Sequence, residues 1–277
     1  MGKKSWFVRN KWFQILAGGI ILFIVTEQAL RITGIPNLIP TVLLLGAFVV
    51  PLTFVAYFYG KERAIDRELH EEQSPLTAAG ICFFIGGVLG VAAAATIEYA
   101  TLHTMSIPAL FGVGFIEELV KLIVPVIFFI RWQHRSEADG LLFGVASGMG
   151  FAALETMGYG LTVLIQSKGN IGAFEEVLFI RGLLSPAGHA AWTGFICAML
   201  WRERNRKGKI AINIIVIGSF VIAVILHGLW DIVNSLGGPS VIQIISMITG
   251  NLVIAAVSLT LLLLRLREAR RISVRQA

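Results

Sequence analysis

The sequence predicts an all-α integral membrane protein, a polytopic bundle of about eight transmembrane helices that forms one domain over residues 1–277. Two observations lead to this fold class. Hydrophobic residues make up 56% of the 277 residues and charged residues only 14%, and the mean hydropathy of +0.79 is well above that of soluble domains. The apolar residues also gather into runs of about 20, the length that a helix needs to cross a bilayer.

Eight of these apolar runs are long enough to span the membrane. Charged or Gly-Pro segments such as TGIPN, KERAIDRE, RWQHRSEAD, RERNRKGK and GGPS separate most of them. Because lipid satisfies no backbone group, each run must be helical. The predicted spans are 12–32, 37–59, 77–97, 107–130, 139–165, 183–201, 210–234 and 240–264.

The basic residues predict the orientation of these helices. With eight spans and the N-terminus inside, nearly all of the 23 lysines and arginines fall in the inner segments, and the outer segments hold only Arg31, Lys168 and Arg181. Since an excess of Lys and Arg marks the cytoplasmic side, we expect both termini in the cytoplasm and a multi-pass protein of the cell membrane. The same clustering at span ends explains the net charge of +6 without nucleic-acid binding.

The segment 166–182 differs from the spans around it. Its sequence KGNIGAFEEVLFIRG, which begins at Lys168, is too short and too charged to cross the bilayer. We expect an amphipathic helix at the outer surface, and two interpretations stay open for the segment, an ordered loop and a gate.

Few ionisable side chains lie inside the spans, and most of them fall between residues 107 and 234. A charged group at the bilayer centre costs about 2.5–3.5 kcal/mol on insertion scales. Several such groups without partners would cost on the order of 10 kcal/mol, so they require either a function or neighbours of opposite charge. The residues are Glu117, Glu118, Lys121, Glu155, His189, His227 and Asp231.

The predicted orientation places these side chains at a similar depth. A helical rise of about 1.5 Å per residue puts Glu118, Glu155, His189 and His227 in one layer between the middle and the outer face of the membrane. Four helices therefore offer polar groups at the same level, although the spans were assigned from hydropathy alone. This convergence predicts a shared polar cavity that opens toward the outer side.

The spacing within each helix adds detail to this cavity. Glu117 and Lys121 are four residues apart and face one another, and Glu118 is three residues from the same lysine. His227 and Asp231 are also four apart, so the carboxylate could accept a proton from the ring and fix its tautomer. The small residues of GLLFGVASGMGFAALE and PAGHAAWTGF allow the helix backbones to approach closely.

Four short motifs resemble those of the PrsW family of membrane proteases. EELVK, from Glu117 to Lys121, matches its E-E-x-x-K signature, and FAALE, ending at Glu155, resembles its F-x-x-x-E motif. PAGHAAWTG supplies the histidine of the third motif, His189, and HGLWD resembles the fourth, H-x-x-x-D, from His227 to Asp231. The motifs occur in order, each inside a predicted span, and define a catalytic core over about 107–235.

The family resemblance implies an enzyme that cleaves membrane-anchored proteins, in bacteria often an anti-sigma factor at a site outside the cytoplasm. It also implies the bacterial plasma membrane as the location. The family is distantly similar to the CAAX prenyl endopeptidases, which have E-E-x-x-x-R and a histidine where Glu155 stands. The lysine at the shorter spacing and the glutamate both favour the PrsW branch, and prenyl-peptide specificity does not carry over.

Two mechanisms of peptide hydrolysis fit these residues, since we find no convincing Ser/His/Asp or Cys/His arrangement. In the first, Glu117 or Glu118 is the general base, and His227 or His189 stabilises the oxyanion or donates a proton to the leaving amine. In the second, zinc is bound by His189, His227 and one or both of Glu155 and Asp231, and Glu118 is the base. In both, Lys121 orients a carboxylate.

Two other classes of function are compatible with buried carboxylates and histidines. A proton-coupled transporter has them too, but it more often has paired half-repeats with broken helices, which we do not find here. A non-catalytic binding or immunity protein of the same fold would retain the same residues. The protease hypothesis predicts that Glu118→Gln or His227→Ala abolishes cleavage without unfolding the protein.

Overall fold

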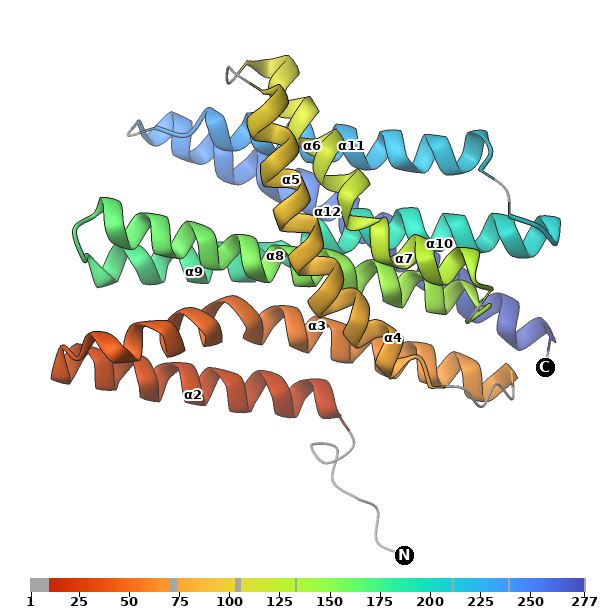
Figure 1. Cartoon of the computed structure of the whole chain (residues 1–277), viewed down its shortest axis with the longest axis horizontal. Helices are drawn as coiled ribbons and strands as arrows, with labels where there is room; N and C mark the ends of the chain where they lie inside the picture. Colours follow the sequence, from red (N-terminus) through yellow and green to blue (C-terminus); the bar gives the residue numbers. More distant parts are fainter. Residues whose placement is uncertain are drawn as a thin grey trace, which may run out of the picture.

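The computed structural model is a bundle of α-helices (Figure 1). No strand occurs in the part of the chain that it describes, which confirms the predicted fold class. The described residues are 10–69, 74–102, 106–132, 134–210, 212–238 and 240–276.

The helices follow the apolar runs closely. Short 3₁₀ turns at Pro36–Leu38 and Ser185–Ala187 and a π-helical turn at Cys82–Gly86 join some of them. The α-helices are α2 (Lys11–Thr33), α3 (Ile39–Leu69), α4 (Leu76–Ile81), α5 (Gly87–Thr101), α6 (Ile107–Lys121), α7 (Ile123–Ile130), α8 (Glu137–Gln166), α9 (Ile171–Leu184), α10 (His189–Lys207), α11 (Ile214–Ser235) and α12 (Val241–Gln276).

Within the described residues, seven helical stretches are long and apolar enough to cross a membrane. They account for all of the predicted spans except 107–130, which is divided into α6 and α7. The protein is therefore a polytopic membrane protein. Helices α3, α7, α10 and α12 end on the same side of the bundle, at the right in Figure 1, and this is the end to which the distribution of basic residues assigns the cytoplasm.

The break between α6 and α7 follows from Pro125. Proline lacks an N–H, and its ring clashes with the carbonyl four residues earlier, which is that of Lys121. The helix is interrupted at Leu122, and the carbonyl oxygen of Lys121 accepts a hydrogen bond from Ser147 of α8 at 2.6 Å instead. Pro125 thus ends helix α6, which carries the glutamate pair, and leaves the carbonyl at that end free to accept a hydrogen bond from α8.

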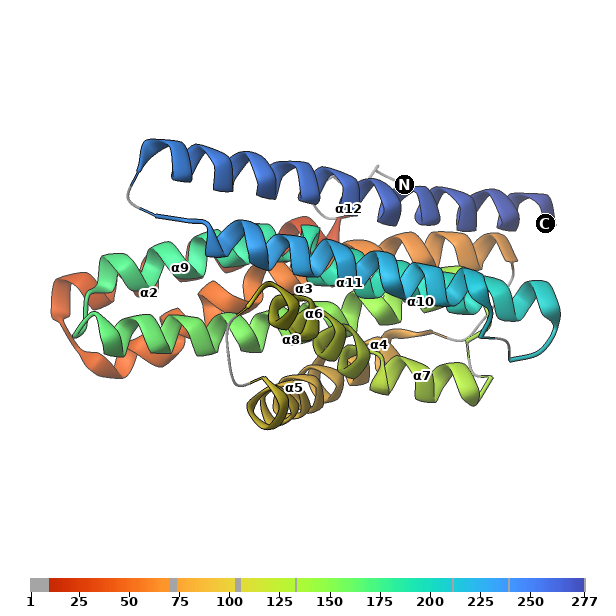
Figure 2. The same cartoon turned by 90° about the horizontal axis from the view of Figure 1, so that it is seen from above.

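The segment 166–182 is neither a surface helix nor a loop, so both expectations for it are wrong. Helix α9 begins within it and packs along α8, and the turn Ser185–Ala187 leads directly into α10 (Figure 2). Phe174 and Leu178 are buried. Two of the charges that suggested exposure have partners on other helices, because Glu175 pairs with Arg31 and Arg181 pairs with Glu155. The predicted span 183–201 is therefore part of a longer interrupted helix, Ile171–Lys207.

Helices α8 and α10 form the centre of the molecule, as the small residues predict. A Cβ atom at Gly148 would lie 2.2 Å from the carbonyl oxygen of His189, and one at Gly144 would lie 2.4 Å from that of Thr193. Only glycine permits so close an approach. The contact fixes the height at which α10 presents both residues to α8.

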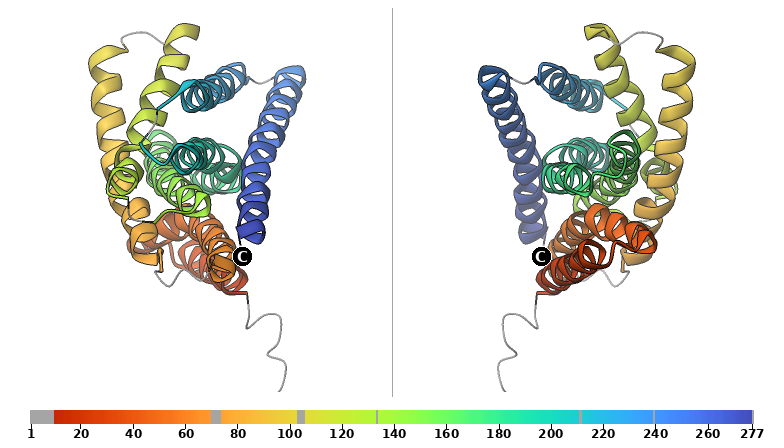
Figure 3. Two further views of the ribbon diagram at one scale, coloured as in Figure 1. Left: turned by 90° about the vertical axis from the view of Figure 1, so that its right-hand side faces the viewer. Right: turned by 90° about the vertical axis from the view of Figure 1, so that its left-hand side faces the viewer.

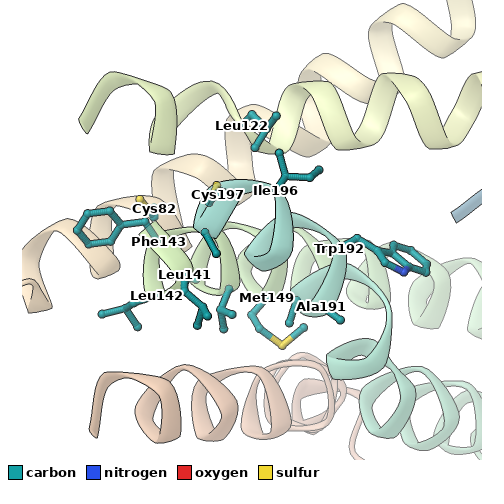
Figure 4. Close-up of a cluster of buried hydrophobic side chains, with 14 of the residues drawn as sticks. Cys82, Leu122, Leu141, Leu142, Phe143, Met149, Ala191, Trp192, Ile196 and Cys197 are labelled. Atoms are coloured by element: carbon teal, nitrogen blue, oxygen red, sulfur yellow. The ribbon is translucent and has the colours of Figure 1, made fainter. Parts of the chain in front are cut away.

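The other helices surround this pair. The end-on views in Figure 3 show α2 and α3 on one side and α11 and α12 on the other, while α5 and α6 cross the bundle obliquely. A hydrophobic cluster fills the space between α8 and α10, and Figure 4 shows Met149, Cys197 and Trp192 within it. Cys82 and Cys197 are both free and buried.

Candidate active site

Lys121, at the end of α6, connects the ionisable residues of the bundle. Its Nζ atom lies 2.9 Å from Glu117 Oε2, 2.9 Å from Glu118 Oε1 and 2.9 Å from His189 Nδ1. The lysine side chain is completely buried. An ammonium group has three donors and no acceptor, so these three contacts use its full hydrogen-bonding capacity.

The two glutamates have different surroundings. Glu118 is fully buried, and besides Lys121 it contacts His227 Nδ1 at 3.0 Å and accepts a hydrogen bond from Thr193 Oγ1 at 3.0 Å. Glu117 shares only Oε2, which lies 3.5 Å from His227 Nε2 and 4.0 Å from His189 Nδ1. The carboxylate of Glu118 is thus fixed on both oxygens, whereas that of Glu117 has an oxygen free to hold another group.

His189 joins this lysine to a second carboxylate. Because the lysine ammonium can only donate, His189 Nδ1 must be the acceptor, and the ring proton is then on Nε2. That atom lies 3.2 Å from Glu155 Oε2, and Arg181 Nη2 approaches the same oxygen at 2.8 Å. The guanidinium of Arg181 also lies 3.9 Å from the centre of the Tyr159 ring, a cation–π contact that orients it.

Asp231 does not fix the tautomer of His227, contrary to the sequence-based interpretation. Its Oδ2 atom is 3.7 Å from His227 Nε2, too far for a hydrogen bond. Glu118 contacts Nδ1 and takes this role, while Nε2 points toward Glu117 and Asp231. The i,i+4 spacing correctly predicts that His227 and Asp231 share one face of α11. Which carboxylate lies nearest to His227 Nδ1 depends on how α6 packs against α11.

All seven predicted site residues thus lie in one connected group, which we call the central cluster: Glu117, Glu118, Lys121, Glu155, His189, His227 and Asp231. Aromatic rings enclose it. Trp192 stacks on His227 with ring centres 4.6 Å apart, and Phe151 lies over His189 at 5.7 Å. The Trp192 indole donates to Ser258 of α12 at 2.9 Å. These rings restrict both histidines to one orientation.

A cavity of about 100 Å³ adjoins the cluster. His189, Trp192 and Arg181 contribute to its wall, together with Trp230 and Asn234 of α11. A buried water needs roughly 10–15 Å³ of such space, so the cavity can hold several. Asp231 is the most exposed member of the cluster, with 25% of its side chain accessible, and Glu118 and Lys121 are the deepest.

Three members of the cluster have the geometry of metal ligands. One ligand atom from each of Glu117, Glu155 and His189 lies within 4.8 Å of the others. Of the metal ligands predicted from the sequence, Glu155 and His189 belong to this group. His227 and Asp231 do not, and Glu117 joins it instead. A histidine and two carboxylates are ligands that zinc accepts, so the residues present fit a zinc ion.

Three residues of this site were not predicted. Arg181 was assigned to an outer loop, and Thr193 and Trp192 were not singled out within PAGHAAWTGF. The spacing of that motif contained a usable signal, because Thr193 lies four residues after His189 and therefore on the same face of α10. Arg181 has no such signal, since its contact with Glu155 depends on how α9 folds back along α8.

Acid–base side chains that meet beside a cavity for several waters within a transmembrane bundle are compatible with a membrane-embedded hydrolase. A family model agrees with this class. The PrsW family intramembrane metalloprotease model matches residues 74–262, more than half of the chain, and the chain belongs to this family. Neither the curated proteins nor the solved structures gave a significant match.

Proposed function

We propose that the central cluster hydrolyses peptide bonds of membrane-anchored proteins, with Glu117 as the residue that activates water. The observation that carries this proposal is the difference between the two neighbouring glutamates. Glu118 has hydrogen-bonding partners on both oxygens. In Glu117 only Oε2 is engaged, by Lys121 at 2.9 Å and with His227 Nε2 at 3.5 Å, and Oε1 has no hydrogen bond to the residues that the structure describes. A general base must contact the water from which it takes a proton.

The proposed reaction uses the residues around Glu117. Glu117 takes a proton from a water molecule, and the hydroxide that is left attacks the peptide carbonyl carbon. His227 donates its Nδ1–H to Glu118, so Nε2 carries a proton only in the imidazolium form, and in that form it donates a hydrogen bond that stabilises the oxyanion. When the carbon–nitrogen bond breaks, the proton held by Glu117 passes to the leaving nitrogen. Glu118 and Lys121 hold the other groups in position.

The family description is that of a metalloprotease, and zinc is the metal that the ligand types here suit. Glu117, Glu155 and His189 are the residues that would hold it, and the ion would supply an activated water and polarise the peptide carbonyl. Metal analysis of the purified protein, with chelation, distinguishes this version from the metal-free one. Full cleavage by metal-free protein excludes zinc, and activity that is lost on chelation and restored by zinc requires it.

The substrate that the site suits is an extended segment next to a membrane anchor. The cluster lies within the bundle, and its cavity is lined by α9 and α11, so a peptide reaches it from within the membrane or from its surface. The predicted orientation favours the outer surface. Anti-sigma-factor-like proteins, which have one span and a segment outside the cytoplasm, have the required form.

Cleavage of a single-span reporter by the full-length protein in proteoliposomes tests this proposal. Glu117→Gln is expected to reduce the rate by at least about 100-fold, the lower range for loss of a general base. Glu176→Gln is the matched control, because Glu176 is an exposed glutamate of α9 outside the cluster. Full activity of Glu117→Gln would contradict the mechanism. Proton-driven uptake with an intact reporter would favour a transporter instead.

A further inference from the structure

A second pocket, separate from the one beside the central cluster, lies between α10 and the inner end of α12. It has a volume of about 280 Å³. One side of it is apolar and is formed by Phe195, Leu261 and Leu264. The other side is basic and is formed by Arg265, Arg267 and Arg271, beside a single carboxylate, Glu268.

The three arginines of this pocket are not equivalent. Arg265 is buried and already pairs with Glu268 and, at 3.6 Å, with Glu137 of α8. Arg267 and Arg271 are exposed and form no ion pair with any residue that the structure describes. They are four residues apart and therefore lie on one face of α12. The pocket thus has two free guanidinium groups at its opening.

The position of the pocket along α12 matches the boundary of the membrane. The apolar run predicted as a span ends at Leu264, so Leu261 and Leu264 lie at the edge of the hydrocarbon layer. With a helical rise of about 1.5 Å per residue, Arg267 and Arg271 lie about 5 and 10 Å beyond Leu264. The polar region of a leaflet is about 5–8 Å thick, so Arg267 lies within it and Arg271 lies just beyond it, where its long side chain can reach back to a headgroup.

We propose that this pocket binds an anionic phospholipid of the inner leaflet. Arg267 and Arg271 bind the phosphate through charge-assisted hydrogen bonds, for which guanidinium groups are well suited. The first carbons of an acyl chain pack on Phe195, Leu261 and Leu264. The apolar side favours a lipid over a soluble anion, and the excess of positive charge favours a headgroup with net negative charge.

The pocket lies mostly beyond the part of the chain that the family model matches. That match ends at residue 262, whereas Leu264, Arg267 and Arg271 follow it. The same helix supports the central cluster through Ser258, which accepts the hydrogen bond from Trp192. A lipid held between α10 and α12 therefore binds the helix that positions the ring stacked on His227.

Lipid binding by the full-length protein tests this proposal. The protein is purified in a mild detergent and titrated with phosphatidylglycerol or phosphatidylcholine, and bound lipid is counted by native mass spectrometry. We expect preference for phosphatidylglycerol, and Arg267→Gln/Arg271→Gln should bind it about 25-fold more weakly, because each arginine near an anionic surface contributes about fivefold in affinity. The control Arg131→Gln/Lys209→Gln removes two exposed charges from the same end and should retain binding.

A pair of leucine variants tests the apolar side of the pocket. Leu264→Gln should weaken phosphatidylglycerol binding, whereas Leu263→Gln should not, because both leucines are exposed but only Leu264 lines the pocket. Equal losses in the two charge variants would show a general surface effect and overturn the proposal. So would unchanged binding by Arg267→Gln/Arg271→Gln, or displacement of the lipid by millimolar inorganic phosphate.

Discussion

Helices α8 and α10 each contribute to two separate groups of charged side chains, and the two groups are built differently. The central cluster contains two histidines and a lysine among its carboxylates. The second group, which we call the terminal cluster, lies near the inner end of the bundle and contains only Arg and Glu: Glu137, Arg202, Arg265 and Glu268.

The difference lies in what the charged groups can still do. In the terminal cluster each charge has an opposite partner, with Arg202 3.4 Å from Glu268 and Arg265 3.6 Å from Glu137. Arginine does not release a proton in proteins, so this group offers no proton donor or acceptor pair. In the central cluster, His227 Nε2 and one oxygen of Glu117 remain available. The terminal cluster also lines a pocket, so buried charge beside a cavity indicates acid–base chemistry only where exchangeable protons accompany it.

The largest expected effect separates structural from chemical roles inside the central cluster. Glu118→Gln should lower the free energy of unfolding by about 3–5 kcal/mol, the cost of removing one partner of a buried ion pair, because the carboxylate contacts Lys121, Thr193 and His227. Glu117→Gln should abolish cleavage with a smaller loss of stability. Chemical unfolding in detergent measures both, and equal destabilisation by the two variants would contradict the assigned roles.

The α8–α10 contact should be the next most sensitive feature. Gly148→Ala places a methyl group against the carbonyl oxygen of His189, and such overpacking costs about 1–3 kcal/mol. Cleavage should fall as well, because the contact sets the height of His189. Gly158→Ala on the same helix has open space around it and is the control. If both variants behave alike, the small residues do not position the site.

The comparison also shows how much of this site could be predicted from the sequence. The seven residues of the central cluster were expected to meet, because hydropathy placed their helices and the helical rise placed their depths. The partners of each residue could not be predicted in the same way. Glu118 rather than Asp231 contacts His227 Nδ1, and this depends on the angle between α6 and α11.

The fold was predictable to a similar degree. The apolar runs gave the helices, and the charge distribution gave an orientation that the ends of α3, α7, α10 and α12 match. The segment 166–182 was misjudged because its charges were taken as a sign of exposure. Arg181 and Glu175 are neutralised by residues more than twenty positions away, and no local pattern reveals such pairs. Pro125 did contain the signal for the break at Leu122.

A smaller effect concerns Arg181, which competes with any metal for Glu155. Zinc binding through Glu117, Glu155 and His189 requires the guanidinium to release the oxygen that it approaches at 2.8 Å. Arg181→Gln should therefore bind zinc at least about tenfold more tightly. Two unit charges this close together near a protein surface interact by roughly 4 kcal/mol, and a third of that energy already corresponds to a tenfold change in affinity. Arg31→Gln, in a separate ion-pair group, should leave zinc affinity unchanged. Weaker binding by Arg181→Gln would contradict this competition.

The smallest effect is expected in the terminal cluster and completes the comparison. Glu137→Gln/Arg265→Met removes one buried charge of each sign, a replacement that is often neutral or stabilising because it also removes the cost of desolvation. Glu268 keeps Arg202 as a partner. Cleavage should stay within about twofold of the wild-type rate. The free energy of unfolding should fall by no more than about 1 kcal/mol, which is the typical effect of a point mutation. A large loss of cleavage with intact folding would show that the terminal cluster contributes to the reaction, and the distinction between the two clusters would then be wrong.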